Sequence, residues 1–536
     1  MQDSWIVLLP PIIVLISAFI SRNIIVSLAA GILSASFIAT NFIPKQAFLL
    51  AFKACQDQLM DIDNLFLFLF LFIVGILVSL IGCTGGAHAF GEKLTKRIKS
   101  DHDVQKAALT IPFLVFMDDY LNCLTTGHVM HPLTDKFQVP RAKLAFFIDS
   151  MTAPLAIITP ISSWAGTIIS QFELSGISLN STEHPVVLID AFSAYLKVIP
   201  FTFYSFIMMA SAWFIVYRKI SFGLMKKHED IAKKTGNVFG GKPPTKERTK
   251  NSNKDNSSVW DIILPIAILV TLVITSVLYL GNHWIFGGEN GLITAFQTKY
   301  NIFLVLFASS LSSLIISSIF ALARKKITLK LIPIIILNGI QVMWTAVLTV
   351  LLAWAFGFLL REQLHTGNYL AEILLGKISI VTLPLMLFLT TNFISILTGS
   401  AWGSIAIMFP ITVPIVLTFL KVHPPVLAEH ISFIFPCLGA VLSGAAAGDH
   451  ISPVSDTTIM SSTSSGSYHL DHVRTQLEYA APSLAGAALA FLISGFLAHK
   501  PPMVSILVSL SSGMALCFII LTILNKLNKK RSQKHI

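Results

Sequence analysis

Charged side chains are scarce in this sequence: Asp, Glu, Lys and Arg together make up 12% of its 536 residues. Soluble domains carry about 25% charged residues, so this scarcity excludes a soluble globular protein. Hydrophobic residues make up 54%, and many apolar runs reach the roughly 20 residues that a helix needs to cross a bilayer. The composition predicts an all-α polytopic membrane protein, with the lipid bilayer as its surroundings.

Cysteine is also scarce, and the common enzyme and cofactor motifs are missing. The five cysteines are scattered without a CxxC pair, which argues against a disulfide framework and a zinc site. HExxH and GxSxG do not occur. The stretch 236–242 approaches a phosphate-binding loop, but Pro243 stands where Ser or Thr is required. We therefore expect no cofactor and no enzymatic activity.

The net charge of +11 comes from Lys and Arg in loops between the apolar runs and in the tail. That distribution is the positive-inside pattern of a membrane protein and does not indicate nucleic acid binding. It predicts a cytoplasmic loop at 92–99, a cytoplasmic linker and a cytoplasmic carboxyl terminus, which places the amino terminus outside. Whether the protein forms a homodimer is left open.

The basic loops also predict two re-entrant hairpins. If the apolar segment 104–134 crossed the membrane, the basic linker 218–258 would lie outside, whereas a hairpin keeps every basic loop inside. The same reasoning predicts a second hairpin at 378–420, which enters from outside. Irregular backbone at membrane depth is tolerated where it lines a cavity or is buried in protein.

These segments give about 11 spans and 2 hairpins in two halves. The first half is 1–217, with its hairpin at 104–134 and a broken helix at 144–170. The second half is 259–525, with its hairpin at 378–420 and a broken helix at 431–462. A flexible basic cytoplasmic linker, 218–258, joins the halves, and a basic cytoplasmic tail, 526–536, ends the chain. The hairpins enter from opposite sides, so the halves are expected to be inverted repeats.

The stretch Ala447–Thr458 follows an apolar run and carries Asp449 and Asp456 among hydroxyls, Gly448 and Pro453. Ionisable residues at bilayer depth are costly and indicate a functional site by default. A helix broken by Gly and Pro and rich in oxygens is typical of an ion or substrate site. The alternative is a polar loop that joins two helices.

An earlier stretch, Ile148–Pro160, has the same order of Asp, hydroxyls and Pro inside apolar sequence. We therefore pair Asp149 with Asp449 as residues that each precede a break. On the hairpins, 123–127 resembles 395–399, because both end in Leu-Thr-Thr-Gly or Leu-Thr-Gly. These matches support the inverted repeats because they occur in the same order within matching elements.

A sodium site needs several hard oxygens, from carboxylates, hydroxyls, amides and carbonyls freed where a helix unwinds. Burial raises the pKa of an Asp carboxyl and a bound cation lowers it, so one carboxylate can carry either a proton or sodium. Asp149, Asp449 and Asp456 are the candidate sodium ligands. The full set of candidate ion-binding residues is Asp118, Asp119, Asn122, Thr125, Asp149, Thr152, Asn392, Ser395, Thr398, Asp449, Ser452, Ser455 and Asp456.

Other polar residues have simpler interpretations. Asp118 and Asp119 point about 100° apart on a helix, so one of them can serve as a helix cap. His450 is expected to be a satisfied packing residue, with proton carriage as the alternative. His469 and His472 are spaced like a metal pair, but two histidines in a cytoplasmic loop are expected to be solvated.

Several of these stretches together resemble the NhaC family of sodium/proton antiporters. The likeness spans roughly residues 60–500 and is carried by Asp118–Gly127, Ile148–Pro154, Thr398–Gly403, Gly448–Thr458 and Asp471–Gln476. The resemblance implies a secondary transporter of the inner membrane with inverted repeats. Some members of that family look like sodium-coupled exchangers of organic acids or amino acids, so the resemblance does not fix the substrate.

The sequence thus favours a multi-pass transporter of the plasma (inner) membrane that exchanges Na⁺ for H⁺. The alternative is a sodium-coupled carrier or exchanger of a small organic acid or amino acid. Arg or Lys at the site would favour that alternative, and the four polar stretches contain neither.

Overall fold

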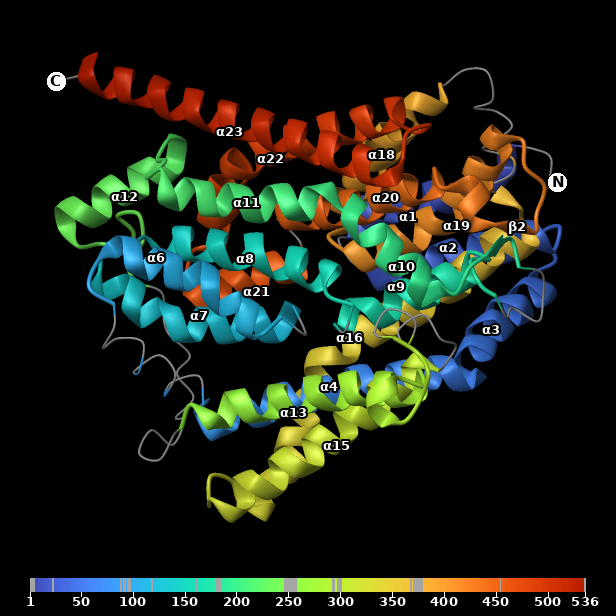
Figure 1. Ribbon diagram of the computed structural model, residues 1–536, viewed down its shortest axis with the longest axis horizontal. Coiled ribbons are helices and arrows are strands. Elements are labelled where there is room, and N and C mark those ends of the chain that lie inside the picture. The colour runs from blue at the N-terminus through green and yellow to red at the C-terminus, as the bar shows by residue number, and fades with distance from the viewer. Residues whose placement is uncertain are drawn as a thin grey trace.

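The computed structural model describes residues 5–21, 24–86, 89, 93, 98–116, 119–160, 162–179, 185–244, 258–291, 295, 301–366, 369, 379–453 and 455–534. Most of these residues are helical, which agrees with the all-α prediction (Figure 1). Within the described residues, seven helices are long and apolar enough to cross a membrane. They are Asn64–Thr84, Trp260–Leu280, Phe303–Ala323, Ala401–Leu420, Ile434–Ile451, His469–Phe496 and Pro502–Lys529.

Shorter apolar helices add to this set, and one candidate span is bent. Ala191–Phe201 and Phe203–Tyr217 meet at 45° and pass the same test as a pair. The shorter apolar helices are Trp5–Val14, Ile25–Ala39, Leu329–Gln341 and Ile380–Ile396. The chain is therefore a multi-pass membrane protein.

One layer of the molecule consists of long apolar helices at the lower edge of Figure 1. There α4 packs against α15 and α16, and Gly75 of α4 lies against the backbone of Gly339 of α16. This layer consists of α4 (Ile62–Thr84), α13 (Trp260–Leu280), α15 (Ile302–Ala323) and α16 (Ile332–Phe358). The other elements in these parts of the chain are η1 (Trp5–Leu8), α1 (Leu9–Ser21), α2 (Ile24–Ala39), α3 (Pro44–Met60), η5 (Trp284–Phe286), η6 (Leu329–Leu331) and a π-helical turn, η7 (Leu359–Gln363).

Where the sequence predicts the first hairpin, the structure has two helices that pack against each other. Ser100 begins α6 (Asp101–Thr110) by accepting a hydrogen bond from the Asp103 amide, as N-cap serines do. The chain continues through η2 (Ile111–Leu114) and returns as α7 (Asp119–Lys136). Asn122 Nδ2 donates to the Pro112 carbonyl at 3.0 Å, which joins the returning helix to the incoming arm.

The first broken helix is α8 (Arg141–Ile158) followed by α9 (Ser163–Leu174). Ser162 caps α9 by accepting from the Ala165 amide. The chain then passes through β1 (Val187–Leu188), α10 (Ala191–Val198) and η3 (Ile199–Phe201) into α11 (Phe203–Tyr217). Every residue of α8 from Arg141 to Ile157 is buried, so this helix lies in the centre of the protein.

A second pair of helices lies where the sequence predicts the second hairpin. Gly399 ends α18 in the left-handed conformation (φ +64°) that favours glycine, and the chain turns directly into α19. The elements are η8 (Ile380–Thr382), α18 (Leu383–Thr398), α19 (Ala401–Leu420), β2 (Val426–Leu427), η9 (Ala428–Ile431), α20 (Ile434–Ile451), α21 (Asp456–Ser465), α22 (His469–Phe496) and α23 (Pro502–Lys534). Ser455 caps α21 by accepting from the Thr458 amide.

The two halves also share a small parallel sheet. Val187 and Leu188 of β1 pair with Val426 and Leu427 of β2. The Val426 amide donates to the Val186 carbonyl at 3.2 Å. Backbone hydrogen bonds thereby join loops whose paired residues are 239 positions apart in the chain (426 − 187 = 239).

Two details of the expected repeat are wrong. Asp149 does not precede a break: it lies mid-way along α8, which continues past Pro154 to Ile158, whereas Asp449 lies in the last turn of α20. Gly127 likewise lies inside α7, where it packs against Ser464, whereas Gly399 lies at the turn between α18 and α19. These short sequence matches therefore do not mark equivalent positions.

The first part of the linker contains a helix, which the sequence did not predict. Residues 223–235 form α12 (Gly223–Thr235), which buries Met225 and Ala232 and ends at Gly236 in the left-handed conformation. Lys143 of α8 pairs with Glu229 of α12 at 2.6 Å, and Lys242 pairs with Asp471 of α22 at 2.7 Å. The segment to residue 244 is therefore docked on the ends of α8 and α22.

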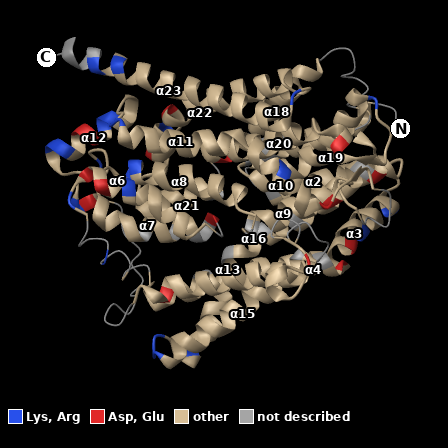
Figure 2. Ribbon diagram, in the orientation of Figure 1, with Lys and Arg blue, Asp and Glu red and all other residues tan. Residues whose placement is uncertain are grey.

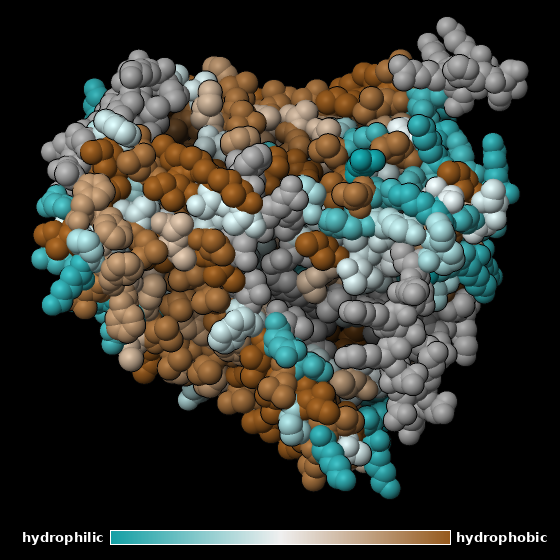
Figure 3. All heavy atoms as spheres, turned by 180° about the vertical axis from the view of Figure 1, so that it is seen from behind, coloured by the Kyte–Doolittle hydropathy of each residue, from teal (hydrophilic) through white to brown (hydrophobic). Residues whose placement is uncertain are grey.

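Charge and hydropathy are distributed as a membrane protein requires. Lys and Arg gather at the end of the molecule formed by α12, the start of α6 and the end of α23 (Figure 2). The face that points away from the viewer in Figure 1 has a broad apolar surface between hydrophilic edges (Figure 3). Many large apolar side chains of the described residues are exposed, among them Ile319, Trp344 and Leu507, as expected of helices that face lipid.

Candidate functional site

The Asp149 carboxylate is buried at the junction of three helices. Its Oδ2 atom accepts hydrogen bonds from Thr458 Oγ1 at 3.1 Å and from Gln476 Nε2 at 2.6 Å. His472 Nε2 lies 3.3 Å from the same oxygen and forms an ion pair with it when the imidazole is protonated. Thr458 comes from α21, whereas Gln476 and His472 come from α22. The side chains of Asp149 and His472 are 1% and 0% exposed.

Asp449 lies beside this cluster and is connected to it through two adjacent threonines. Thr457 Oγ1 donates to Asp449 Oδ2 at 2.8 Å. Thr458 Oγ1 is 3.4 Å from the Asp449 carbonyl as well as 3.1 Å from Asp149. The capped start of α21 therefore presents one hydroxyl to each of the two aspartates. The structure brings these two predicted residues together.

His450 extends the hydrogen-bonded cluster to α11. Its Nδ1 atom lies 2.6 Å from the Tyr204 hydroxyl, and its Nε2 atom lies 3.4 Å from Ser150 Oγ. Gln476 Nε2 also donates to the His450 carbonyl. Asp149 and His450 are thus linked through a shared donor, Gln476, in the protein interior.

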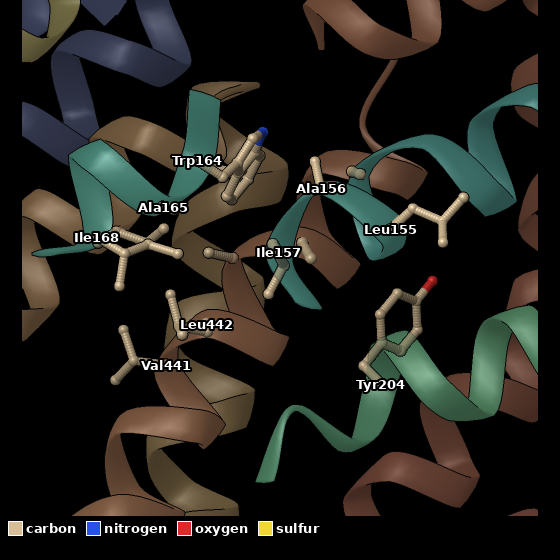
Figure 4. Packing of buried hydrophobic residues seen from close by; sticks show 14 of the residues in the cluster. Leu155, Ala156, Ile157, Trp164, Ala165, Ile168, Tyr204, Val441 and Leu442 are labelled. Carbon is tan, nitrogen blue, oxygen red and sulfur yellow. The ribbon is translucent and has the colours of Figure 1, made fainter. Parts of the chain in front are cut away.

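The surroundings of this polar cluster are apolar. Figure 4 shows residues at the end of α8 and the start of α9, including Ile157 and Trp164, packed near Val441 and Leu442 of α20. Tyr204 lies at the side of this apolar layer, on α11. Because apolar walls lower the local dielectric, charges and hydrogen bonds inside the cluster interact more strongly than they would in water.

Two oxygens of the cluster are buried without a hydrogen-bond partner among the described residues. They are Asp149 Oδ1 and Gln476 Oε1. A buried acceptor that stays unpaired costs about 1–3 kcal/mol, and more when it is charged. Carboxylate and amide oxygens are ligands of hard cations. Asp149 Oδ1 can therefore accept either a proton or a metal cation.

A second buried carboxylate lies where the first hairpin meets the break between α8 and α9. Trp164 Nε1 donates to Asp119 Oδ2 at 2.8 Å. The Trp164 ring lies 4.4 Å from that of Trp402, centroid to centroid, and Trp402 is the second residue of α19, just after the turn that follows α18. Asp119 at the start of α7 is therefore close to the turns of both helix pairs.

Thr152 and Cys123 fill the space between α7, α8 and α21. Cys123 Sγ lies 3.3 Å from Ser461 Oγ and 3.7 Å from Thr152 Oγ1. Thr152 Oγ1 donates to the Ile148 carbonyl in its own helix. The predicted residue Thr152 and its neighbour Cys123 therefore pack the site helices together.

The second hairpin reaches the site through α20. Ser395 Oγ donates to the Ala445 carbonyl at 2.7 Å, and Ser452 Oγ donates to the Ile396 carbonyl at 2.9 Å. Gly448 makes this approach possible, since a Cβ atom there would meet the Asn392 carbonyl and lie 2.5 Å from Ser395 Cβ. The predicted residues Ser395 and Ser452 therefore fix α18 to α20 next to Asp449.

The remaining predicted residues are placed as follows. Asn122 and Thr125 are buried on α7, and Asn122 Oδ1 accepts from Thr126 Oγ1 at 3.0 Å. Asn392 Nδ2 has no partner among the described residues. Ser455 Oγ lies 3.0 Å from Thr457 Oγ1. Asp118 lies outside the described residues, as do the side chains of Thr398 and Asp456.

The sequence did not single out Tyr204, Gln476 or His472 as site residues, and for His472 the expectation is wrong. His472 is fully buried against Asp149. His469, one turn earlier, instead lies 2.7 Å from the Pro453 carbonyl at a more exposed position. Gln476 follows His472 by four residues, so both lie on one face of α22. The four-residue spacing of His472 and Gln476 is the feature of the sequence that could have shown that they share one helix face.

Two basic side chains of α8 form ion pairs at its start and not with Asp149. Arg141 and Lys143 are buried at the start of α8, where Arg141 pairs with Asp135 at 2.7 Å and Lys143 pairs with Glu229. Asp149 is more than one helical turn further along the helix. In the part of the chain that the structure describes, no three His, Cys, Asp or Glu side chains are grouped to hold a metal ion.

Residues 150–496 match the model of the Na⁺/H⁺ antiporter family, and this segment is more than half of the chain. The chain belongs to the Na⁺/H⁺ antiporter family. It is accordingly an antiporter-type membrane transporter and not an enzyme. The match includes Asp449, His450, Thr458, His472 and Gln476, and it begins one residue after Asp149.

Two relatives and two solved structures are similar to this antiporter-family chain. A protein of Haemophilus influenzae described as uncharacterized is 29% identical over 499 residues, which is 91% of this chain and 90% of the relative. The malate-2H⁺/Na⁺-lactate antiporter of Bacillus subtilis is 32% identical over 107 residues, 20% of each chain.

The solved structures are more distant. The Alcanivorax borkumensis YdaH transporter is 13% identical with a TM-score of 0.40, covering 82% of this chain and 90% of that one. MtrF of Neisseria gonorrhoeae, described with a class of antimetabolite efflux pumps, is also 13% identical, with a TM-score of 0.32 and coverages of 86% and 85%.

Proposed function

We propose that this transporter exchanges Na⁺ for H⁺, and that Asp149 is the carboxylate that holds one cation or the other. The observation that carries the proposal is the state of its two oxygens: Oδ2 accepts hydrogen bonds, whereas Oδ1 is buried without a partner among the described residues. Burying an uncompensated carboxylate costs several kcal/mol. Binding either H⁺ or Na⁺ removes the negative charge, so the two cations compete for Asp149.

The neighbouring groups have distinct roles in this proposal. Thr458 and Gln476 orient the carboxylate through Oδ2 and leave Oδ1 for the cation. Asp449, which the start of α21 links to Asp149, adds a second negative charge near the site. Asp456 stays a candidate sodium ligand from the sequence. Because sodium prefers oxygen ligands, the Gln476 Oε1 atom, which is buried without a partner among the described residues, is a further candidate ligand.

A proton route is supported by the chain of titratable and hydroxyl groups around Asp149. His472 lies on one side of the carboxylate. On the other side, Gln476 donates to Asp149 and to the main-chain carbonyl of His450, so it orients the carboxylate and carries no proton itself. Histidine can both accept and release a proton near neutral pH. We infer that His472 delivers or receives the proton, since it contacts Asp149 directly.

For topology we propose two inverted halves with the amino terminus outside and the linker and carboxyl terminus in the cytoplasm. The basic residues around α12 and the end of α23 support this orientation. Alternating access would move one hairpin and broken helix against the layer of α4, α13, α15 and α16. Such motion of one repeat against a fixed part is typical of transporters built from inverted repeats.

The test uses purified protein in proteoliposomes with an imposed sodium gradient and a pH-sensitive dye inside. Wild-type protein should move protons against the sodium flux, and Asp149→Asn should reduce this exchange to the background of empty liposomes. Asp57→Asn, at an exposed position of α3, is the matched control and should exchange as the wild type does. Wild-type rates in Asp149→Asn would refute the role of Asp149.

A second candidate is exchange coupled to a small organic acid. It is favoured by the 107 residues that are similar to the malate-2H⁺/Na⁺-lactate antiporter. Repeating the assay with lactate or malate inside the liposomes separates the two. If sodium-driven pH change occurs only with an organic acid, this second function holds. If it occurs equally without one, plain Na⁺/H⁺ exchange holds.

A further inference from the structure

A cavity of about 260 Å³ lies at the basic end of the molecule, away from Asp149. It is enclosed by α6, the loop between α7 and α8, the end of α11, α12 and α23. Five lysines line it: Lys143, Lys219, Lys226, Lys233 and Lys529. They come from four separate parts of the chain, so the fold and not one basic run of sequence brings them together.

The acidic residues of the cavity are mostly neutralised by internal partners. Glu229 accepts from Lys143 Nζ at 2.6 Å and from Ser221 Oγ at 2.5 Å, so both of its carboxylate oxygens are engaged. Asp230 pairs with Lys226 at 2.8 Å on the same helix. Asp101, at the start of α6, is the remaining acidic lining residue.

Three lysines are left over after these pairs are formed. Lys219, Lys233 and Lys529 line the cavity from the end of α11, from α12 and from α23, and none has a salt bridge to a described residue. Against Asp101 they leave an excess of two positive charges (3 − 1 = 2). Like charges gathered from separate elements repel one another, and a bound anion would relieve that repulsion.

The position of the cavity suits a group at the membrane surface. Tyr217, the last residue of α11, is 60% exposed beside it, and its ring stacks with that of Trp213 at 5.8 Å. Exposed Tyr and Trp side chains at helix ends mark the depth of lipid head groups. The cavity is slightly smaller than sites for drug-sized molecules, which occupy about 300–1,000 Å³, so it fits a compact anionic group.

We propose that this cavity binds a phosphate group, held by Lys219, Lys233 and Lys529. Lysine is a common phosphate ligand because it supplies a point charge and several donors. The phosphate can come from the head group of an anionic phospholipid or from a small soluble phosphate compound. Basic pockets between membrane helices on the cytoplasmic side bind anionic lipid head groups.

The experiment has one arm for each source and does not depend on transport. In the first arm, thermal unfolding is followed in neutral detergent with increasing inorganic phosphate or pyrophosphate, and chloride at equal ionic strength is the salt control. In the second arm, nanodiscs of phosphatidylcholine are compared with nanodiscs that also contain phosphatidylglycerol. A ligand that binds only the folded state raises the unfolding temperature by mass action.

The triple variant Lys219→Gln, Lys233→Gln, Lys529→Gln should weaken binding at least about tenfold, because it removes the three positive charges that hold the anion. All three lysines are exposed, so the fold should tolerate their replacement. The matched control is Lys45→Gln, Lys53→Gln, Lys330→Gln, which removes three exposed lysines elsewhere and should bind as the wild type does.

Stabilisation by anionic lipid alone assigns the cavity to a head group, and stabilisation by soluble phosphate assigns it to a free anion. Either result supports the proposal if the triple variant loses the effect. The proposal is overturned if neither arm stabilises the wild type, or if the triple variant and the control respond equally.

Discussion

The Thr458 hydroxyl donates to the Asp149 carboxylate at 3.1 Å across 309 positions of sequence. This contact joins the start of α21 to the middle of α8, and the same hydroxyl lies 3.4 Å from the Asp449 carbonyl. A short shift of α21 would therefore change the hydrogen bonding of Asp149 and Asp449 together. That coupling gives the proposed exchange a structural basis for responding to bound cations.

Thr458→Val should raise the sodium concentration for half-maximal exchange by about tenfold or more. A hydrogen bond to a charged group contributes about 1.5–3 kcal/mol, and valine keeps the shape of threonine without its hydroxyl. Thr458→Ser should restore most of the loss. Thr463→Val on the same helix is the control, since the Thr463 hydroxyl is exposed and bonds only to the Ile459 carbonyl. Proteoliposome exchange at several sodium concentrations measures all three, and equal behaviour of Thr458→Val and Thr463→Val would contradict the role of Thr458.

Gly448→Ala should destabilise the protein by about 1–3 kcal/mol, as overpacking of a close contact usually does. The added methyl group would meet the backbone of α18 at Asn392 and Ile396, which cannot move aside like a flexible side chain. Gly82→Ala on α4 is the matched control, because no heavy atom lies within 4 Å of the position that its methyl group would take. Thermal unfolding in detergent should show a lower midpoint for Gly448→Ala only. An unchanged midpoint would mean that α18 and α20 are not packed as described.

Replacing only one partner of the buried ion pair between Lys143 and Glu229 should lower the free energy of unfolding strongly. Their side chains are 6% and 13% exposed, and removing one partner of a buried pair costs about 3–5 kcal/mol. Lys143→Met and Glu229→Leu should each lower the unfolding midpoint strongly, and the double variant should recover much of the loss. Lys226→Gln, which breaks the more exposed pair with Asp230, should cost less than about 1 kcal/mol. Additive losses in the double variant would show that the two side chains do not interact.

His228 should make the docking of α12 sensitive to acid. Burial lowers the pKa of His228 below its ordinary value of 6.5, and Lys242 lowers it further, whereas Asp471 raises it. The unfolded state then binds the proton more readily than the folded state, so stability is greatest above about pH 6.5 and is lost as the pH falls towards the lower folded pKa. Unfolding midpoints at pH 7.5 and 5.5 should differ more in the wild type than in His228→Gln. His499→Gln, at an exposed site, should keep the wild-type difference, and an identical difference in all three proteins would rule out His228.

Much of the candidate site could be predicted because carboxylates and hydroxyls inside apolar runs are rare. Asp149 and Asp449 stood out for that reason, and the structure places them at one junction. The position of the first break was harder to predict. Pro154 removes an amide donor but does not end α8, which continues to Ile158; prolines inside membrane helices are tolerated when neighbouring groups satisfy the freed carbonyls.

His472 and Gln476 could not be assigned from local sequence because Asp471 and Arg474 surround them with charge. Whether such a segment is a solvated loop or the first turns of a helix depends on the elements packed against it, here α8 and α21. The docked helix α12 was missed for a similar reason. Its polar composition resembled a flexible linker, but its partners, Lys143 and Glu478, lie on α8 and α22.

The small sheet of β1 and β2 has a consequence for how substitutions affect the protein. Its hydrogen bonds join main-chain atoms. Replacing Val187 or Leu427 with almost any residue would therefore leave the pairing of β1 with β2 intact. Proline at position 426 is the exception, because the Val426 amide is the donor to Val186 and proline has no N–H. The backbone pairing of the two strands can therefore be retained when the side chains around it are substituted.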